Sequence, residues 1–439
     1  MCRTALAALG AVDSGWVERS RSIAAAFAVL IAVGASHLAS PPAADAKARG
    51  GAGAALRQNL TLRGMSSARI SCAPIAAKSA RCRYTAKRGT PTGTLNKCKG
   101  KARLRSAKRG WKVKARDRCK IVRLGPPPAL GFEEFGSDPK NVAISVAAGA
   151  TTDRLLVNWG DIEAVPGVYD WSKYDQLYNQ FTAAGIHPVL VAEGAPQWAA
   201  VQGVVCGLDV CPAPPASAHD AQWGRFVAEI ARRYPLAKGI EIWNEPNSDL
   251  FWSTGPDPAR YADLLKTSYS AIKKVNPGMP VILGGLYPYP IPGVASSDPA
   301  EFLAGVYRYG AGSSFDAVGA HPYPSGPPWV QSIMDLLRPL RQVMAANGDA
   351  MKPFWLTEVG VSTLGRASEA EQAAALTGLL DTARTSGEIA VVLIHELKDQ
   401  QGPWPEWTWG LGVLHADGTP KASFCALAAR VGHSCAVPS

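Results

Sequence analysis

Two glutamates in this chain each follow a short apolar run, and together they could cleave a glycosidic bond. Glu245 lies in the segment Trp-Asn-Glu-Pro-Asn after the mostly apolar residues 239–242, and Glu358 follows residues 353–357 in the same way. Runs of this kind predict buried strands. Glycoside hydrolysis needs two carboxyl groups, because one protonates the leaving oxygen while the other attacks the anomeric carbon. These two glutamates are therefore the candidate catalytic pair.

The elements that must position this pair alternate between strand and helix from residue 129 onward. We expect a helix over 258–275, because Asp257 is a suitable N-cap and Pro258 suits the first helical position. A second helix should begin at Ser368, with Glu371 completing a capping box. Strands are predicted near 129–135, 154–159, 187–193, 239–244, 280–286, 316–321, 353–358 and 391–396.

Eight strands alternating with helices predict an α/β fold, a (β/α)8 TIM barrel. A doubly wound open sheet is the alternative, but no Gly-rich nucleotide loop follows the first strand. In a barrel, strands four and seven carry Glu245 and Glu358 at their carboxyl ends, on the same rim of the barrel.

The charge is divided unevenly along the chain. Residues 47–123 hold 23 Lys or Arg and one acid, Asp117, whereas residues 124–439 hold 20 Lys or Arg and 31 Asp or Glu. Together with the composition of the amino terminus, this division predicts four segments: a signal peptide over 1–46, a linker over 47–56, a small basic β module over 57–123 and the barrel over 124–439. Residues 59–62 and 110–114 alternate between polar and apolar side chains, as short strands of the module would.

Cysteine usage and the amino terminus indicate export. Residues 23–35 form an apolar core of signal-peptide length, and residues 44–46 offer a small-x-small cleavage site. We expect a secreted or cell-wall-associated protein, with an uncleaved membrane anchor as the alternative.

The chain has nine cysteines, and eight remain when Cys2 in the expected signal peptide is set aside; an even number in an exported chain indicates disulfides. Proximity favours Cys206–Cys211 and Cys425–Cys435, and four further cysteines would staple the small basic module. Free or metal-binding thiols are the alternative. Beyond Cys2, the cysteines are Cys72, Cys82, Cys98, Cys119, Cys206, Cys211, Cys425 and Cys435.

Taken in order, the motifs of residues 129–427 resemble clan A glycoside hydrolases, the retaining enzymes of the (β/α)8 fold. Within the clan, the chain is most similar to the family thirty-nine xylosidase-like and the family five cellulase-like enzymes. The stretches that carry the resemblance are residues 154–159, 162–163, 167–171, 240–247, 321–323, 355–360, 410–414 and 417–421.

The resemblance implies a role for each matching residue. Glu245 would be the general acid/base and Glu358 the nucleophile, and Asn244 would hydrogen-bond the sugar 2-hydroxyl. It implies no metal and no organic cofactor. Glu193 and Glu396 also end apolar runs and remain rival carboxylates.

Three further polar residues would serve this pair. Tyr323 would hydrogen-bond Glu358, Arg154 would help to hold Glu358 ionised, and His321 would line the site and contact sugar hydroxyls. The structural alternatives are a salt bridge of Arg154 with Asp153 or Glu163, and core hydrogen bonds for Tyr323 and His321.

Tryptophans offer flat apolar faces on which sugar rings stack. The candidates are Trp159, Trp198, Trp404 and Trp409, with Trp252 and Trp407 also considered, and barrel packing is the alternative for each. Many cellulase-like relatives carry a Trp at the end of strand eight. This chain has His395 and Glu396 there.

The basic module should attract anionic polymers, because Lys or Arg stands at nearly every second position from 97 to 123. For an exported protein we expect a cell-wall partner such as teichoic acid, an acidic polysaccharide or anionic lipid headgroups. Nucleic acid and a solvated arm without a partner are the alternatives. For the whole chain, a secreted retaining O-glycosidase acting on β-linked polysaccharide or oligosaccharide is expected, with no stable protein partner. A non-catalytic carbohydrate- or wall-binding protein is the alternative.

Overall fold

The computed structural model describes residues 51–63, 65–76, 79–107, 110–133, 138–203, 213–288, 296–402 and 406–437. Several expectations fall outside these residues. They are the signal peptide over 1–46, the first residues of the linker, the Cys206–Cys211 bridge and the stacking role of Trp404.

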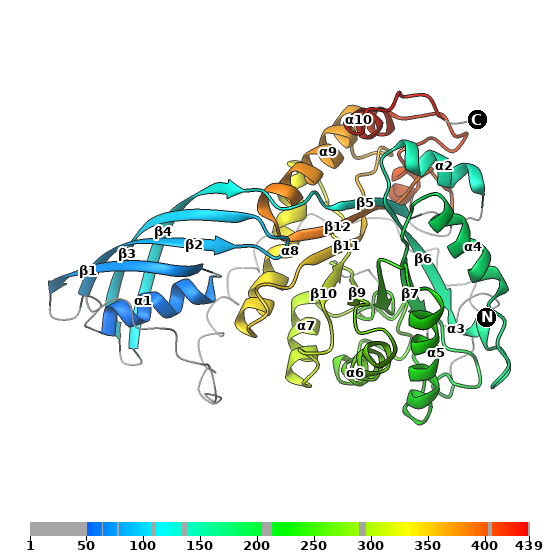
Figure 1. The fold of residues 1–439 in the computed structure, drawn as a ribbon, viewed down its shortest axis with the longest axis horizontal. Coiled ribbons are helices and arrows are strands. Elements are labelled where there is room, and N and C mark those ends of the chain that lie inside the picture. Colours follow the sequence, from blue (N-terminus) through cyan, green and yellow to red (C-terminus); the bar gives the residue numbers. More distant parts are fainter. Residues whose placement is uncertain are drawn as a thin grey trace, which may run out of the picture. The chain divides into compact units, whose positions relative to one another are not determined.

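Eight parallel strands close into a barrel, so the predicted (β/α)8 fold is confirmed (Figure 1). Each strand lies within a few residues of its predicted position. Around the barrel the order is β10-β11-β12-β5-β6-β7-β8-β9, so the last strand pairs with the first. The strands are β5 (Ala129–Glu133), β6 (Thr152–Asn158), β7 (Val189–Glu193), β8 (Gly239–Ile242), β9 (Val281–Leu286), β10 (Ala317–Ala320), β11 (Phe354–Val359) and β12 (Ile389–Ile394).

Helices alternate with the strands and cover the outside of the barrel (Figure 1). The predicted helix α6 (Pro258–Val275) begins as expected, with Asp257 accepting from the backbone N–H groups of Ala259 and Arg260. The capping box of Ser368 and Glu371 starts α9 (Glu369–Ser386). The others are α2 (Pro139–Ala147), α3 (Trp159–Ile162), α4 (Ser172–Ala183), α5 (Asp220–Arg233), α7 (Pro299–Arg308), α8 (Trp329–Ala346) and α10 (Ala422–Arg430), with 3-10 turns η1 (Ser217–His219) and η2 (Glu406–Gly410).

None of the helices in the described residues combines the length and apolar character that crossing a bilayer requires.

The two ends of the barrel interior differ in chemistry. Val189, Ile282 and Trp355, which lie at the amino-terminal ends of β7, β9 and β11, belong to one buried apolar cluster. Charged and polar side chains are instead buried at the carboxyl ends, among them Glu193 and Glu358. The apolar end closes the barrel, and the polar end holds the groups that could react.

The basic module is a four-stranded antiparallel sheet in the order β1-β2-β3-β4. Its strands are β1 (Met65–Ala76), β2 (Ser79–Gly89), β3 (Leu95–Ala107) and β4 (Gly110–Arg123), and helix α1 (Gly51–Leu62) packs on one face. Disulfides join Cys72 to Cys82 and Cys98 to Cys119, each pair facing across neighbouring strands. The disulfides that were predicted to cross-link the basic module are therefore present.

Near the carboxyl terminus, a third disulfide joins Cys425 and Cys435, as proximity predicted.

The strand expected over residues 59–62 is wrong, because these residues lie in α1. Ala52, Leu56 and Leu60 are buried at a spacing of four residues, which is a helical period. In the isolated segment 59–62, polar and apolar residues also alternate, and four residues are too few to separate the two periods.

Replacing Leu56 by Ala should destabilise the module, because this fully buried side chain packs α1 against the sheet. We expect a loss of roughly 2–5 kcal/mol. Hydrogen exchange of backbone amides in residues 65–123, followed by mass spectrometry, measures it. Gln58→Ala on the exposed side of α1 is the matched control and should change exchange little; equal effects of both variants would contradict this packing.

Candidate functional site

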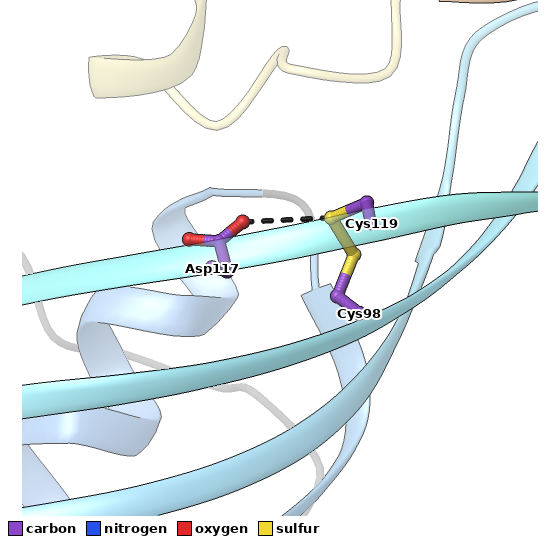
Figure 2. Close-up of side chains that lie close together, drawn as sticks. All are labelled: Cys98, Asp117 and Cys119. Atoms are coloured by element: carbon purple, nitrogen blue, oxygen red, sulfur yellow. Dashed lines mark hydrogen bonds between the residues drawn. A yellow bond between two sulfur atoms is a disulfide. The ribbon is translucent and has the colours of Figure 1, made fainter.

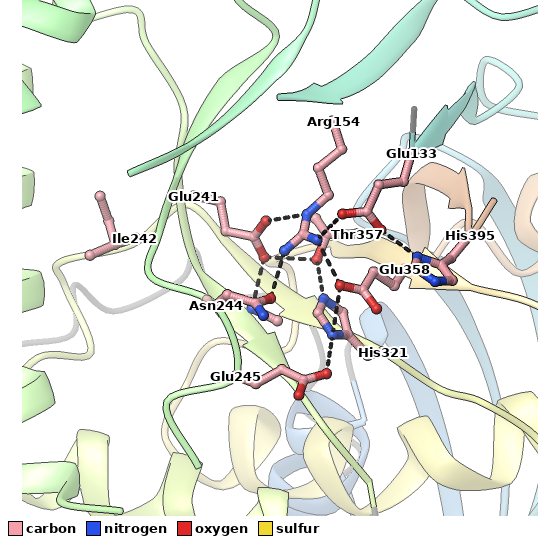
Figure 3. A network of polar contacts seen from close by, with 12 residues as sticks. Glu133, Arg154, Glu241, Ile242, Asn244, Glu245, His321, Thr357, Glu358 and His395 are labelled. Carbon is pink, nitrogen blue, oxygen red and sulfur yellow. Dashed lines mark hydrogen bonds and ion pairs between the residues drawn. The ribbon is translucent and has the colours of Figure 1, made fainter. Parts of the chain in front are cut away.

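Polar side chains from six of the eight barrel strands converge at the carboxyl ends of the strands (Figure 3). Parallel strands carry their functional residues at this end in barrels of this type. The group is formed by Glu133, Arg154, Glu241, Asn244, Glu245, His321, Tyr323, Thr357, Glu358 and His395, which are buried or nearly so.

Arg154 is the centre of this network. Its Nη1 donates to Glu358 Oε1 at 2.6 Å and to Glu133 Oε1 at 2.8 Å, and its Nε donates to Glu241 Oε2 at 3.1 Å. Its Nη2 donates to Asn244 Oδ1 at 2.8 Å. One guanidinium thus orients three carboxylates and an amide, a geometry that lysine could not supply. The alternative salt bridge of Arg154 with Asp153 or Glu163 is not formed.

Glu245 and Glu358 face each other beside His321. One oxygen of each carboxyl group and a ring nitrogen of His321 all lie within 4.8 Å of one another. His321 Nδ1 is 2.8 Å from Glu245 Oε1 and 3.5 Å from Glu358 Oε1. Tyr323 donates to Glu358 Oε2 at 2.6 Å, so both oxygens of Glu358 accept a hydrogen bond.

The two carboxyl groups have different surroundings. Burial and then the nearby charge of Glu358 raise the pKa of Glu245 well above its usual range, and Arg154 only partly offsets them. Glu358 accepts from a guanidinium and a phenol, and both contacts stabilise its anion. Among the described residues, the only side chain that hydrogen-bonds to the Glu245 carboxyl group is His321. This difference suits an acid paired with an anion.

A chain of hydrogen bonds runs from Glu245 through His321 and Thr357 to Glu241. Thr357 Oγ1 is 3.1 Å from His321 Nε2 and 2.7 Å from Glu241 Oε1. Burial raises the pKa of Glu241, but Arg154 and the Gly285 N–H both donate to its carboxylate and oppose this rise. The Thr357 hydroxyl therefore donates to Glu241 and accepts from His321 Nε2–H.

This pattern assigns the His321 tautomer. Burial lowers the pKa of His321 to about 3, so the ring is neutral and carries one N–H. Because Nε2 holds that hydrogen, Nδ1 is an acceptor, and the bond between His321 and Glu245 requires the proton to reside on the carboxyl group. His321 was expected to contact sugar hydroxyls. In the structure it is fully buried, and both of its ring nitrogens bond to protein groups.

The backbone after β8 turns sharply to present Glu245. Trp243 and Glu245 both have positive φ, 68° and 40°, which is uncommon for residues other than glycine. The turn is secured by the Glu245 N–H, which donates to the Gly285 carbonyl at 3.1 Å. Gly285 must itself be glycine, because a Cβ there would lie 1.9 Å from His321 Nε2.

Glu133 and His395 form an ion pair on the other side of Arg154, with His395 Nδ1 2.5 Å from Glu133 Oε2. Burial would raise the pKa of Glu133, but Arg154 and His395 outweigh burial and lower it. Burial would likewise lower the pKa of His395, but the charge and hydrogen bond of Glu133 raise it to about 9. At neutral pH His395 is therefore a second cation in the site.

The rival carboxylates Glu193 and Glu396 lie at the same end of the barrel but outside the close pair. Neither bonds to Arg154. Burial raises the pKa of each to about 7, with Arg154 opposing this for Glu193 and His395 for Glu396. Glu396 accepts from Gln400 at 2.6 Å.

The predicted tryptophans occupy different environments. Trp159 is fully buried among Trp198, Trp223 and Phe226, so its proposed stacking on sugar is not supported. Trp198 is half-buried and donates to the Glu163 carbonyl.

Trp407 lies beside one of the residues that contact the carboxyl pair. Its ring centroid is 5.7 Å from that of Tyr323, the partner of Glu358. Trp409 is half-buried in the same turn, η2. Trp252 is fully buried.

The acidic groups of this site and one group in the basic module have the spacing of metal ligands. In the basic module, Cys98 and Cys119 form a disulfide beside Asp117 (Figure 2), and a disulfide offers no thiolate to a metal. In the barrel, Glu358 belongs to both acidic groups and already accepts from Arg154. A cation there would lie against the guanidinium, which disfavours a metal site.

Glu133, Glu241 and Thr357 were missed as site residues. Glu133 follows an apolar run just as Glu245 does, so the same signal could have found it. Glu241 and Thr357 lie inside their strands, where alternation predicts only that they face the barrel interior or the helices.

Comparisons with known proteins support the fold. No protein-family model matches the chain, and no curated sequence matches it. By structure, the chain is similar to a family 39 glycoside hydrolase from the gut symbiont Bacteroides cellulosilyticus, with a TM-score of 0.56 and 19% identity, covering 83% of this chain and 77% of that one.

Two further solved structures are also similar. A GH39 enzyme from Xanthomonas axonopodis gives a TM-score of 0.54 at 19% identity, covering 72% of this chain and 69% of that one. An exo-β-1,4-mannosidase from an Opitutaceae bacterium gives 0.51 at 17% identity, covering 69% and 58%. The resemblance to clan A glycosidases is thus confirmed for the fold.

Replacing His395 by Gln should cost stability only in one pH range. The folded-state pKa of His395 is raised to about 9 from 6.5, so its pairing with Glu133 stabilises fully below about pH 6.5 and is lost as the pH rises through about 9. Glu133, with a lowered pKa, must also be ionised. The difference in free energy of unfolding between wild type and variant should therefore be largest near pH 6 and shrink towards pH 10. Denaturant titrations of both proteins at a series of pH values measure it, and a pH-independent difference would contradict the ion pair.

Proposed function

We propose that the barrel is a retaining glycoside hydrolase in which Glu245 is the general acid/base and Glu358 the nucleophile. The observation that carries this proposal is that one carboxylate oxygen of Glu245 lies within 4.8 Å of one carboxylate oxygen of Glu358. Retaining enzymes place the two groups about 5–5.5 Å apart, whereas inverting enzymes leave about 6.5–9.5 Å for a water molecule.

In the first step, the Glu358 carboxylate attacks the anomeric carbon while Glu245 gives its proton to the leaving oxygen. Arg154 and Tyr323 hold Glu358 in place and keep it anionic. The acceptor nitrogen of His321 keeps the proton on Glu245 until the glycosidic oxygen takes it. Asn244 Oδ1 accepts from Arg154, and its amide N–H groups, which have no partner among the described residues, are the donors proposed for the sugar 2-hydroxyl.

In the second step, water releases the sugar from Glu358. Burial and the charge of Glu358 raise the pKa of Glu245. Formation of the glycosyl ester removes that charge, so the pKa of Glu245 falls and its carboxylate can accept a proton from the attacking water. One residue thereby serves as acid and then as base.

The substrate class and the location are proposed on two further observations. A β-linked glycoside is proposed because one structural neighbour is described as an exo-β-1,4-mannosidase. Export is proposed because the described residues contain three disulfides, which persist in oxidising compartments.

Glu358→Ala should lower kcat for aryl β-glycosides by roughly 10⁴-fold or more, because the attacking group is lost. Added azide should restore part of the turnover and yield the glycosyl azide of inverted configuration. The measurement is release of the aryl group with and without azide, using the aryl glycosides that the wild type cleaves.

Glu193→Ala is the matched control, because it removes a buried carboxyl group from the same rim. It should show no azide rescue. Rescue in this variant, or first-formed product of inverted configuration from the wild type, would contradict the assignment. Polysaccharide binding without any cleavage would indicate the non-catalytic alternative.

Thr357→Val should move the basic limb of the kcat/KM pH profile to lower pH. Without the hydroxyl, His321 Nε2–H loses its acceptor, so the tautomer with hydrogen on Nδ1 becomes accessible. That tautomer donates to Glu245, favours the ionised carboxylate and lowers its pKa. Thr357→Ser keeps the hydroxyl and should keep the wild-type limb. An unshifted profile in the Val variant would disprove the role of the hydrogen-bond chain.

A further inference from the structure

The outer face of the basic sheet, opposite α1, carries rows of cations. Every second residue from Lys97 to Arg105 in β3 and from Lys112 to Lys120 in β4 is Lys or Arg, and each of these side chains is exposed. The strand register places them side by side. Arg83, Lys101 and Arg116 form one row across β2, β3 and β4, and Arg81, Arg103 and Lys114 form the next.

This arrangement opposes folding. Like charges directly opposite each other on neighbouring strands are destabilising. Lysines on an edge strand can prevent unwanted strand pairing, but β2 and β3 lie inside the sheet, where no such protection is needed. The rows therefore call for an explanation other than folding.

No acid on the sheet offsets these charges. Asp117, the one acidic residue of 47–123, lies on the inner face beside the Cys98–Cys119 disulfide (Figure 2). It accepts hydrogen bonds there from Arg63 and from Tyr84. Among the described residues, none of the six cations in the two rows forms a salt bridge.

We propose that this outer face binds an extended acidic polysaccharide. Neighbouring strands are about 4.8 Å apart, and alternate residues along a strand are about 6.7 Å apart. The shorter interval is comparable to the length of one sugar in an extended chain. A polymer with a carboxylate on each sugar thus presents charges at the spacing of a cross-strand row, and neutralising the row removes the repulsion within it.

The other residues of the two rows favour an acidic polysaccharide over single-stranded nucleic acid and over a membrane surface. The β1 positions that complete the two rows are small, with Ser71 opposite Arg83 and Ala73 opposite Arg81. Single-stranded nucleic acid is usually held by aromatic stacking, and the rows contain no aromatic ring. Membrane-surface elements combine cations with large apolar side chains, which the rows also lack. The disulfides of the module fit an oxidising location, where polysaccharide is available. The inference does not depend on catalysis by the barrel.

The test replaces Arg83, Lys101 and Arg116 together by Gln in the full chain. Binding to immobilised polygalacturonate is measured over a range of salt concentrations, with neutral dextran as a reference. Wild type should bind polygalacturonate and not dextran. At about 0.1 M salt the triple variant should bind at least about 10-fold more weakly. Its binding should also depend less steeply on salt, since fewer counterions are exchanged.

The matched control replaces Lys140, Lys274 and Arg308, three exposed cations of the barrel, by Gln and should bind within about twofold of wild type. Thermal unfolding of both variants verifies that the sheet is intact. Equal losses in both variants, or no binding by wild type, would overturn the proposal. Tighter binding to single-stranded DNA or to phosphatidylglycerol vesicles than to polygalacturonate would also overturn it.

Discussion

The barrel depends on one buried cation, the guanidinium of Arg154. Burying several carboxylates together is costly unless each finds an opposite charge and donors of hydrogen bonds. Arg154 supplies these to Glu133, Glu241 and Glu358 at once. The guanidinium is held by acids on three strands, which raise its pKa well above the usual range although burial opposes this. Its position is consequently fixed by strands β5, β8 and β11, and it fixes them in return.

The asymmetry of the catalytic candidates follows from this position. Arg154 donates a hydrogen bond to Glu358, but it acts on Glu245 only by through-space electrostatics. Glu245 hydrogen-bonds to a neutral imidazole instead. Two glutamates of the same type thereby acquire different proton affinities. The chain from His321 through Thr357 to Glu241 then returns to Arg154, so the acid and the anion are tied to one network (Figure 3).

The two parts of the chain use charge in opposite ways. In the barrel, acids are gathered inside, where Arg154 pairs with three of them and His395 pairs with Glu133. In the basic sheet, cations are displayed on an exposed face while the lone Asp117 is turned inward. Exposed like charges are tolerable because water screens them, whereas buried ones must be paired. The two disulfides of the sheet add stability that offsets the repulsion between the cations on this face.

Local patterns in the sequence were enough to predict the barrel and to select the two glutamates as the candidate catalytic pair. Eight apolar runs separated by helical periodicities predict strands and helices, and a Glu at the end of a run predicts a carboxylate on the rim. The caps Asp257 and Ser368 also follow from short-range chemistry. Segment 59–62 shows the limit of such short patterns. Its alternation alone fits a strand, and the helical period is recognised only when Ala52 and Leu56 are included.

Only the tertiary structure decided what those residues touch. Arg154 is 204 positions from Glu358 and 87 from Glu241, and nothing local in the sequence indicates that one side chain reaches both. The roles of Thr357 and His321 depend on a hydrogen-bond direction that exists only when β8, β9, β10 and β11 lie side by side in the barrel. The burial of Trp159 and the position of Trp407 beside Tyr323 likewise depend on packing between distant segments. The sequence alone determined which residue types stand at the ends of the strands, and closure of the barrel determined which of them meet.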